Sequence, residues 1–417
     1  MTGADLPRLL TEIPGPASRA WVDRLAQVEC PAITARRTRR AAALGVAHDD
    51  PIVWDAAVGA NIQDVDGNVY VDLTAGFGVA AAGHRNPAVV AAGQAQLGHL
   101  VHAMGDAFPD PRRVLLMERL CALSGMDRVI LGSSGSDAVE AALKTARLAT
   151  GRDGVLVFDG AYHGLSYGAL AMSQYKAADF QAPFRGQLGG HVRVLPFGGV
   201  LPGPEDLAGI GAVLVEPIQG RGGIRVPPPG WLAGLAAAAH AAGALLIFDE
   251  IYTGFGRTGG WFAFQDEGVR PDLLCVGKGL GGGFPVSACL GPKAVLDAWG
   301  ASKGEALHTQ TFLGNPVGAA MAFASISAIE GLLPHVRATH DWLMARLAHR
   351  GVPARGRGLL LGLGVPEPLA VCRALLQRGY LVLPAGEHDP VLALTPPLCI
   401  TREQLSAFLD ALDQVLA

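Results

Sequence analysis

One lysine of this chain stands in a setting that suits chemistry better than surface solvation. Lys278 follows the apolar run 273–276 and lies among glycines in the segment PDLLCVGKGLGGGFPVS (271–287). Lysines are scarce, since only five occur among the 33 basic residues. We interpret 277–285 as a flexible loop at the end of a buried strand. An amine placed there can attack a carbonyl group or carry a proton.

A carboxylate ends the apolar run that precedes this one. Asp249 follows ALLIF (244–248) and begins DEIYTGFGRTG. A buried carboxylate is costly unless it meets a cation or a hydrogen-bond donor. Asp249 therefore caps the next turn, pairs with Arg257, or holds a protonated ring nitrogen of a ligand.

The segment GSSGSDAVEAALKTAR (132–147) places small residues and hydroxyls at the start of a predicted helix. Such a start presents free N–H groups and the positive end of the helix dipole, which together bind anions. The alternative is an ordinary helix cap made by Ser136 or Asp137. The Gly-Lys-Ser/Thr ending of a nucleotide-binding loop is missing, so a single phosphate is the expected anion.

These three features are the three groups that hold pyridoxal 5′-phosphate. The cofactor needs a lysine for covalent attachment, a carboxylate for its ring nitrogen and an anchor for its phosphate. Lys278, Asp249 and the loop 132–137 supply one each, so we expect this cofactor and no metal.

The elements that would position these residues are short apolar runs separated by Ala-rich helical stretches such as 137–149 and 231–242. Strands that are apolar throughout predict an α/β fold with a mostly parallel sheet covered on both faces. Ligands bind such sheets at the carboxyl ends of the strands. Glu216, Asp159, Tyr162 and His163 also follow apolar runs there. The runs are VIL (129–131), VLVF (155–158), VRVL (192–195), AVLV (212–215), ALLIF (244–248), LLCV (273–276) and VSACL (286–290).

The two ends of the chain have a different pattern of predicted elements from the middle. NIQDVDGNVYVDL (61–73) reads as a hairpin with an Asp-Gly turn, and the C-terminal third reads as helices with a few strands. We therefore expect residues 1–75 and 316–417 to form one small α+β domain beside a large domain of residues 76–315.

Composition excludes several classes of protein. The 417 residues are 50% hydrophobic and 17% charged, which indicates a large core. A net charge of −4 gives no reason to expect nucleic acid or a membrane surface as partner. The cluster Arg36, Arg37, Arg39 and Arg40 is interpreted as a solvated or interface helix face. The apolar stretch 231–248 is interrupted by His240 and Gly243, too much for a membrane span.

Cysteine usage and the N-terminus point to a reducing compartment. The six cysteines lie far apart and form none of the close pairs typical of metal or redox sites. The N-terminal segment has early acidic residues and prolines at 7, 14 and 16, unlike a signal peptide. A cytoplasmic location is expected.

Six segments in order resemble the class III (omega) aminotransferases of fold type I, over nearly the whole chain. SSGSDAVEAALKTAR resembles the family's phosphate loop, GAYHG (160–164) its ring-stacking segment and VEPIQG (215–220) its next strand end. IFDEIYTGFGRTG (247–259) resembles its pyridine-nitrogen motif, GKGLGGGFP (277–285) the segment of its cofactor-binding lysine, and HTQTFLGNP (308–316) the segment with a phosphate-binding threonine.

The resemblance implies a role for each matching residue. Lys278 would bind the cofactor covalently and later carry a proton, while Asp249 would keep the ring nitrogen protonated. Tyr162 and Ile251 would pack on the two faces of the ring. The family forms homodimers with shared active sites, so Thr311 would reach the phosphate of the partner subunit. Gln219 would line the site beside Glu216, unless the two only stabilise a turn. The implied cofactor-binding residues are Ser134, Gly135, Ser136, Tyr162, Glu216, Asp249, Ile251, Lys278 and Thr311.

Departures from the family bear on the substrate. Many members carry an arginine two residues before the xPPL segment, where this chain has Ala393, and a glutamate after PIQG, where it has Arg221. Arg221 either binds a substrate carboxylate from a new direction or points outward to an acidic neighbour. Arg221 and Phe77 are the candidate substrate residues. Tyr252 stands where glutamine is common in the family, and Asp137 stands where glutamate is common. We expect the site to tolerate both changes.

The expected activity is transfer of an amino group from an amine or amino acid to an oxo acid or aldehyde by a ping-pong mechanism. A racemase, epimerase or aminomutase on the same scaffold is the alternative, since removal of the Cα proton is common to all. A non-catalytic cofactor- or phosphate-binding protein is disfavoured because Lys278 and Asp249 are both present.

Overall fold

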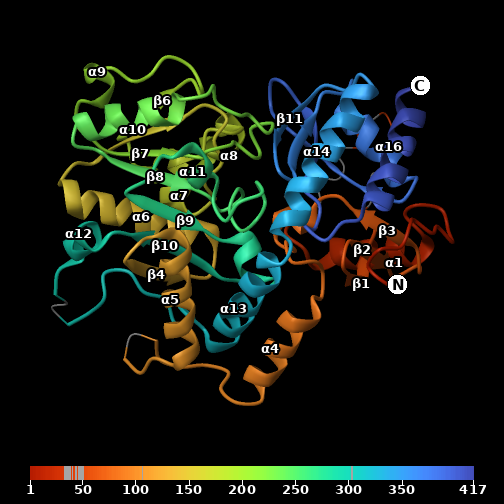
Figure 1. Cartoon of the computed structure of the whole chain (residues 1–417), viewed down its shortest axis with the longest axis horizontal. Helices are drawn as coiled ribbons and strands as arrows, with labels where there is room; N and C mark the ends of the chain where they lie inside the picture. Colours follow the sequence, from red (N-terminus) through yellow and green to blue (C-terminus); the bar gives the residue numbers. More distant parts are fainter. Residues whose placement is uncertain (32–38, 40, 43–44, 46–50, 106, 302–303) are drawn as a thin grey trace.

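A computed structural model describes residues 1–31, 39, 41–42, 45, 51–105, 107–301 and 304–417 (Figure 1). Of the predicted arginine cluster, Arg36, Arg37 and Arg40 lie outside the described residues, and Arg39 is exposed.

All seven apolar runs form strands of one sheet. The strands lie in the order β4-β10-β9-β8-β7-β5-β6, and β10 is antiparallel to both of its neighbours while all other pairs are parallel. The predicted mostly parallel seven-stranded sheet is thereby confirmed. The strands are β4 (Arg128–Gly132), β5 (Gly154–Phe158), β6 (Val192–Leu195), β7 (Ile210–Val215), β8 (Leu245–Asp249), β9 (Leu273–Val276) and β10 (Ser287–Gly291).

Helices cover both faces of this sheet, which explains why its strands are apolar throughout. Alternate residues of β7, such as Ala212 and Leu214, pack in a cluster with α6 (Gly135–Thr150), α7 (Tyr167–Met172) and α12 (Lys293–Leu296). The intervening residues, such as Val213 and Val215, join the cluster that includes α5 (Pro111–Ser124) and α10 (Trp231–Ala241). Because each strand is buried on two sides, period-two alternation is absent from its sequence.

Two four-stranded sheets lie beside the large one, at the right of Figure 1. The predicted hairpin is β2–β3, with Asp66 and Gly67 in its connection. Strand β13 from the C-terminal region pairs in parallel with β3, so both ends of the chain build one α+β unit as expected. The first sheet contains β1 (Trp54–Val58), β2 (Asn61–Asp64), β3 (Val69–Asp72) and β13 (Tyr380–Leu381); the second contains β11 (Ala354–Arg357), β12 (Leu360–Leu363), β15 (Val391–Leu394) and β14 (Leu383–Ala385).

Further helices complete the layers. Helix α13 packs against α4 and α5, next to the large sheet (Figure 1). The domain limits at 75/76 and 315/316 remain predictions. The remaining helices are α1 (Pro16–Val28), α3 (Ala75–Gly78), α4 (Pro87–Leu97), α8 (Ala177–Phe180), α9 (Pro204–Leu207), α11 (Ala263–Glu267), α13 (Pro316–Glu330), α14 (Leu333–His349), α15 (Pro368–Leu376) and α16 (Arg402–Leu416), and the 3₁₀ helices are η1 (Ala182–Phe184), η2 (Lys278–Gly281) and η3 (Asp297–Trp299).

Among the described residues, no single helix is both long and apolar enough to cross a membrane. The helices α13 and α14 together reach the length and apolar composition of a membrane span, but they are bent by 54° where they meet. None of the six cysteines forms a disulfide bond, and no group of three His, Cys, Asp or Glu side chains in the described ranges is arranged to hold a metal ion.

A buried arginine fixes the loop after β8 to the C-terminal region. The Arg257 side chain is fully buried, and its Nη1 donates hydrogen bonds to the carbonyls of Leu359 (3.0 Å) and Pro396 (2.6 Å). Burial lowers the pKa of Arg257 from 12.5 to about 10, and the nearby Tyr252 and Asp72 oppose this shift. Arg257 thus does not pair with Asp249. It connects the segment that carries Asp249 to the segment that carries Ala393.

We predict that Arg257→Met lowers the free energy of unfolding by about 3 kcal/mol, because two buried carbonyls lose their donor. Urea denaturation of the apoprotein would measure this loss. The exposed Arg337, whose Nε donates to the carbonyl of Gly259, offers a matched control. Arg337→Met should cost less than about 1 kcal/mol. Equal losses in the two variants would contradict the role given to the buried guanidinium.

Candidate active site

A cavity of about 460 Å³ lies at the carboxyl ends of the parallel strands. This volume falls in the range of small-molecule sites. Residues that follow β4, β5, β7, β8 and β9 all contribute to its wall, as the sequence predicts for such a sheet. Its lining consists of Val79, Ser133, Ser134, Gly135, Ser136, Tyr162, His163, Gly164, Leu165, Glu216, Arg221, Asp249, Ile251, Tyr252, Lys278, Gly283, Phe284, Pro285 and Val286.

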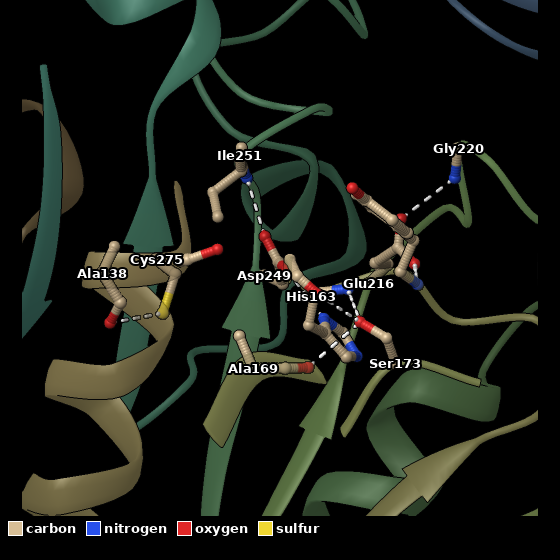
Figure 2. A network of polar contacts seen from close by, with 12 residues as sticks. Ala138, His163, Ala169, Ser173, Glu216, Gly220, Asp249, Ile251 and Cys275 are labelled. Carbon is tan, nitrogen blue, oxygen red and sulfur yellow. Dashed lines mark hydrogen bonds and ion pairs between the residues drawn. The ribbon is translucent and has the colours of Figure 1, made fainter. Parts of the chain in front are cut away.

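The carboxylate of Asp249 is held at the end of β8 by two hydrogen bonds (Figure 2). Its Oδ2 lies 2.7 Å from Nδ1 of His163, and its Oδ1 accepts a bond of 3.1 Å from the Ile251 N–H. The carboxylate needs a donor, so His163 carries its proton on Nδ1. The His163 ring is completely buried and its Nε2 has no partner. Asp249 therefore caps the next turn, as one alternative predicted, and its charge is stabilised within the cavity wall.

Glu216 follows β7 and stabilises the turn that follows while it lines the cavity. Its Oε1 accepts a hydrogen bond from the Tyr162 N–H and its Oε2 accepts one from the Gly220 N–H, both at 3.0 Å (Figure 2). Burial raises the pKa of this carboxyl, although the nearby His163 and the two N–H donors oppose the shift. Glu216 thus both lines the cavity and stabilises the turn after β7, the two alternatives given for it from the sequence.

Lys278 begins the short 3₁₀ helix η2 and faces the cavity. The flexible loop expected here is wrong, because a Cβ at Gly279 would meet the Cβ atoms of Ala81 at 3.0 Å and Phe255 at 3.4 Å. Glycine in this segment permits close packing. Burial lowers the pKa of the Lys278 amine, while the carboxylates of Asp249 and Glu216 raise it.

The N-terminus of α6 opens onto the cavity. The helix begins at Gly135, and its cap is Ser134 rather than Ser136 or Asp137. Burial raises the pKa of Asp137, but a hydrogen bond from Gln310 and N–H bonds from Ser133 and Ser134 hold it below its ordinary value. Within the part of the chain that is described, the N–H groups of Gly135 and Ser136 have no acceptor.

Tyr252 occupies the floor of the cavity and fits only because two neighbours are glycines. Its ring centroid lies 4.5 Å from Lys278 Nζ, and its hydroxyl donates to Thr395 Oγ1 at 3.2 Å. A Cβ at Gly220 would lie 2.1 Å from this ring and one at Gly78 would lie 2.5 Å from it. The ring also packs against the apolar cluster that contains Ala393. Tyr252 is thus a principal part of the cavity rather than a tolerated change.

Arg221 lines the same cavity and does not point outward to an acidic neighbour. Its guanidinium Cζ lies 4.8 Å from the ring centroid of Tyr162 and 5.2 Å from that of Tyr175. Its Nε is buried without a hydrogen-bond partner. No ion pair of Arg221 occurs among the described residues.

Several residues singled out in the sequence lie outside the cavity lining. Thr311 is exposed, and Phe77 is 56% exposed with a backbone φ of 65°. Gln219 is buried and donates from Nε2 to the carbonyl of Asp159, so it stabilises the turn rather than the cavity. Asp159 itself pairs with Arg225.

Sequence reasoning did not identify three contributors. His163 was noted only for its place after a strand, yet it bonds Asp249 across the intervening β7. Tyr175 gave no signal, because its contact with Arg221 joins residues far apart in the chain. Tyr252 could be found only as a departure from the family pattern.

Comparisons with known proteins identify the family of the chain. The family "Aminotransferase class-III" matches residues 44–198 and 204–416. The acetylornithine aminotransferase of Methanosarcina acetivorans is 36% identical over 87% of this chain and 91% of its own. The acetylornithine aminotransferase of Mycobacterium tuberculosis is 40% identical over 88% and 92%. The structure of an ornithine aminotransferase from Toxoplasma gondii, with pyridoxal phosphate at partial occupancy in its active site, superimposes with a TM-score of 0.81, 30% identity, and coverage of 88% and 89%. The chain therefore belongs to the class III aminotransferases.

Proposed function

We propose that this aminotransferase works with pyridoxal 5′-phosphate, that Lys278 is the residue to which the cofactor attaches, and that Asp249 faces the cofactor's ring nitrogen. One observation carries the proposal. An amine, a buried carboxylate and an open helix N-terminus face one cavity at the carboxyl ends of the sheet.

The residues present fit this cofactor. The free N–H groups of Gly135 and Ser136 and the hydroxyl of Ser134 suit a phosphate at the N-terminus of α6. Gly135 also leaves room for Ile251, since a Cβ at this position would meet Ile251 Cδ1 at 2.9 Å. Tyr162 and Ile251 are assigned to the two faces of the ring, and Glu216 to its edge.

Pyridoxal 5′-phosphate supplies an aldehyde that condenses with amines and a ring that accepts electrons from the substrate. Side chains of the protein transfer protons and stabilise charge. Burial lowers the pKa of Lys278 Nζ, which favours the neutral form that can accept a proton and give it back. Asp249 provides a fixed negative charge that stabilises a proton on a ring nitrogen. Phe284, Pro285 and Val286 form an apolar wall beside Lys278.

A homodimer with shared active sites is part of the proposal. A surface built from α4, α5, α13 and residues 98–105, 107–110 and 304–313 exposes many large apolar side chains, as interfaces between subunits do. Thr311 lies in this region and is exposed, which suits a residue that reaches the phosphate of the partner subunit. A cytoplasmic location is also proposed, and six cysteines without a disulfide bond support it. The exposed apolar residues are Leu97, Leu100, Val101, Met104, Phe108, Val114, Leu115, Leu307, Phe312 and Phe323.

Incubation of the holoenzyme with amine donors and no acceptor tests the reaction class. An aminotransferase should release one equivalent of oxo product per active site and then stop, because the amino group stays on the enzyme. A racemase or epimerase would interconvert donor stereoisomers without oxo product.

Lys278→Ala should abolish both the visible absorbance of the bound cofactor and the single turnover, with an unchanged circular dichroism spectrum. Wild-type turnover in this variant would refute the assignment of Lys278.

We predict that Asp249→Ala lowers kcat more than tenfold, a loss above about 1.4 kcal/mol of transition-state stabilisation. Without the carboxylate, no other side chain is assigned to hold a proton on the ring nitrogen, and removal of the substrate proton slows. Steady-state kinetics at saturating cofactor would measure the change. Asp159→Ala is the matched control, since this carboxylate also follows a strand but lies outside the cavity. Retention of more than a tenth of kcat in Asp249→Ala would assign Asp249 a purely structural role.

The lowered pKa of Lys278 predicts how its reactivity depends on pH. Between its own pKa and the ordinary value of 10.5, Lys278 is neutral in the folded chain but charged in the unfolded chain. Its acetylation in the apoenzyme should therefore level off at a lower pH than in the denatured chain, as peptide mass spectrometry can show. Asp249→Asn should lower this midpoint further, because the carboxylate of Asp249 raises the pKa. A midpoint equal to that of the denatured chain would contradict the effect of burial.

A further inference from the structure

Arg221 is held in place by contacts that leave its charge unopposed. It follows β7 in the turn that begins at Gly220, and its carbonyl accepts a hydrogen bond of 2.9 Å from the Gly386 N–H. The rings of Tyr162 and Tyr175 contact its guanidinium, at 4.8 and 5.2 Å from their centroids. Such contacts orient a cation but do not neutralise it.

The two carboxylates that line the cavity together with Arg221 accept hydrogen bonds from other donors. Glu216 accepts from the N–H groups of Tyr162 and Gly220, and Asp249 accepts from His163 and Ile251. Burial also raises the pKa of Glu216, while the two N–H donors oppose this shift. Arg221 forms no ion pair with any described residue, and its buried Nε has no partner. A partly buried guanidinium stays charged, so this arrangement is unfavourable unless an anion completes it.

The anion that would pair with Arg221 is distinct from the phosphate expected at the N-terminus of α6. That position offers the N–H groups of Gly135 and Ser136 and the hydroxyl of Ser134. Arg221 makes its contacts instead on the side of Tyr162 and Tyr175. It is the only arginine among the described residues that line the cavity. Position 393 in β15 is an alanine of the apolar cluster against which Tyr252 packs, so it supplies no positive charge.

We propose that Arg221 binds the carboxylate of the substrate, and that Tyr175 positions the guanidinium for this task. The inference rests on the proposed function and adds its substrate class, which is amino acids, ω-amino acids and the matching oxo acids rather than plain amines. Planar guanidinium and carboxylate groups form paired hydrogen bonds, which fix the substrate in one orientation. Because one arginine serves both half-reactions, donor and acceptor carboxylates use the same position in turn.

Matched donors separate the carboxylate from the amine. 4-Aminobutyrate and butylamine form one pair, and L-alanine and isopropylamine form the other, so that a methyl group replaces the carboxylate in both. In Arg221→Met, kcat/KM for whichever carboxylated donor the wild type uses should fall about ten- to a hundredfold, the loss of a charge-assisted pair. The values for plain amines should change less than threefold. Arg185→Met, at an exposed arginine outside the cavity, should leave all four values unchanged.

Binding of an unreactive carboxylate gives a readout independent of turnover. Calorimetry with butyrate and propionate should show Kd values at least tenfold weaker for Arg221→Met holoenzyme than for the wild type, with unchanged affinity for pyridoxal 5′-phosphate. Equal carboxylate affinity in both proteins, an equal loss for carboxylated and plain donors, or a parallel loss of cofactor affinity would overturn the proposal. Failure of the proposed function would look different: no oxo product from any donor, with carboxylate binding still dependent on Arg221.

Tyr175 lies outside the cavity lining and is tested as a positioning residue. Tyr175→Leu should raise KM for the carboxylated donor severalfold with little change in kcat, whereas Tyr175→Phe keeps the ring and should retain the wild-type KM. In the Arg221→Met background, Tyr175→Leu should have no further effect, because the group that it positions is gone. The same loss in both backgrounds would show that Tyr175 acts only on the fold.

Discussion

The burial of a negative charge at the end of β8 is the constraint on which the rest of the site depends. A carboxylate at this depth is stable only where donors meet it, and Asp249 finds one in the next turn and one in His163. His163 belongs to the connection after β5, which must cross β7 to reach Asp249. The Tyr162 N–H in the same connection bonds Glu216. One buried charge therefore fixes the position of the segment that carries Tyr162 and borders Arg221.

A second constraint is steric and concerns Tyr252. Its ring fills the space between Lys278 and the apolar cluster of Ala393, and it demands glycine at positions 78 and 220. An arginine at position 393 would have to displace this ring or place its charge in the cluster. The presence of Tyr252 and the absence of a cation at 393 are thus two aspects of one packing arrangement. Arg221 is the only arginine among the described residues that line the cavity.

The fold could be predicted from the sequence to the extent that it depends on burial. Strands buried on both faces are continuous apolar runs, and all seven runs became strands, with ends that differ by at most two residues. The residues that follow the parallel strands lie together because the carboxyl ends of these strands share one edge of the sheet.

Contacts between side chains far apart in the chain could not be predicted. The bond from His163 to Asp249, the ring of Tyr175 beside Arg221 and the direction of Gln219 depend on how loops pack over the sheet. Close packing around Gly279 was missed because glycine is compatible with both flexible loops and tight contacts.

Charge balance within the cavity connects these constraints to substrate choice. Asp249 is stabilised by His163, and Glu216 by two N–H groups, so neither needs Arg221. Lys278 lies near both carboxylates, which raise its pKa against the effect of burial. Arg221 forms no ion pair with any described residue, and its buried Nε has no hydrogen-bond partner. Aromatic rings can hold a guanidinium still at little cost because they neither neutralise it nor compete for its N–H groups. A site arranged in this way is complementary to a ligand that brings its own anion, and it discriminates against a ligand that does not.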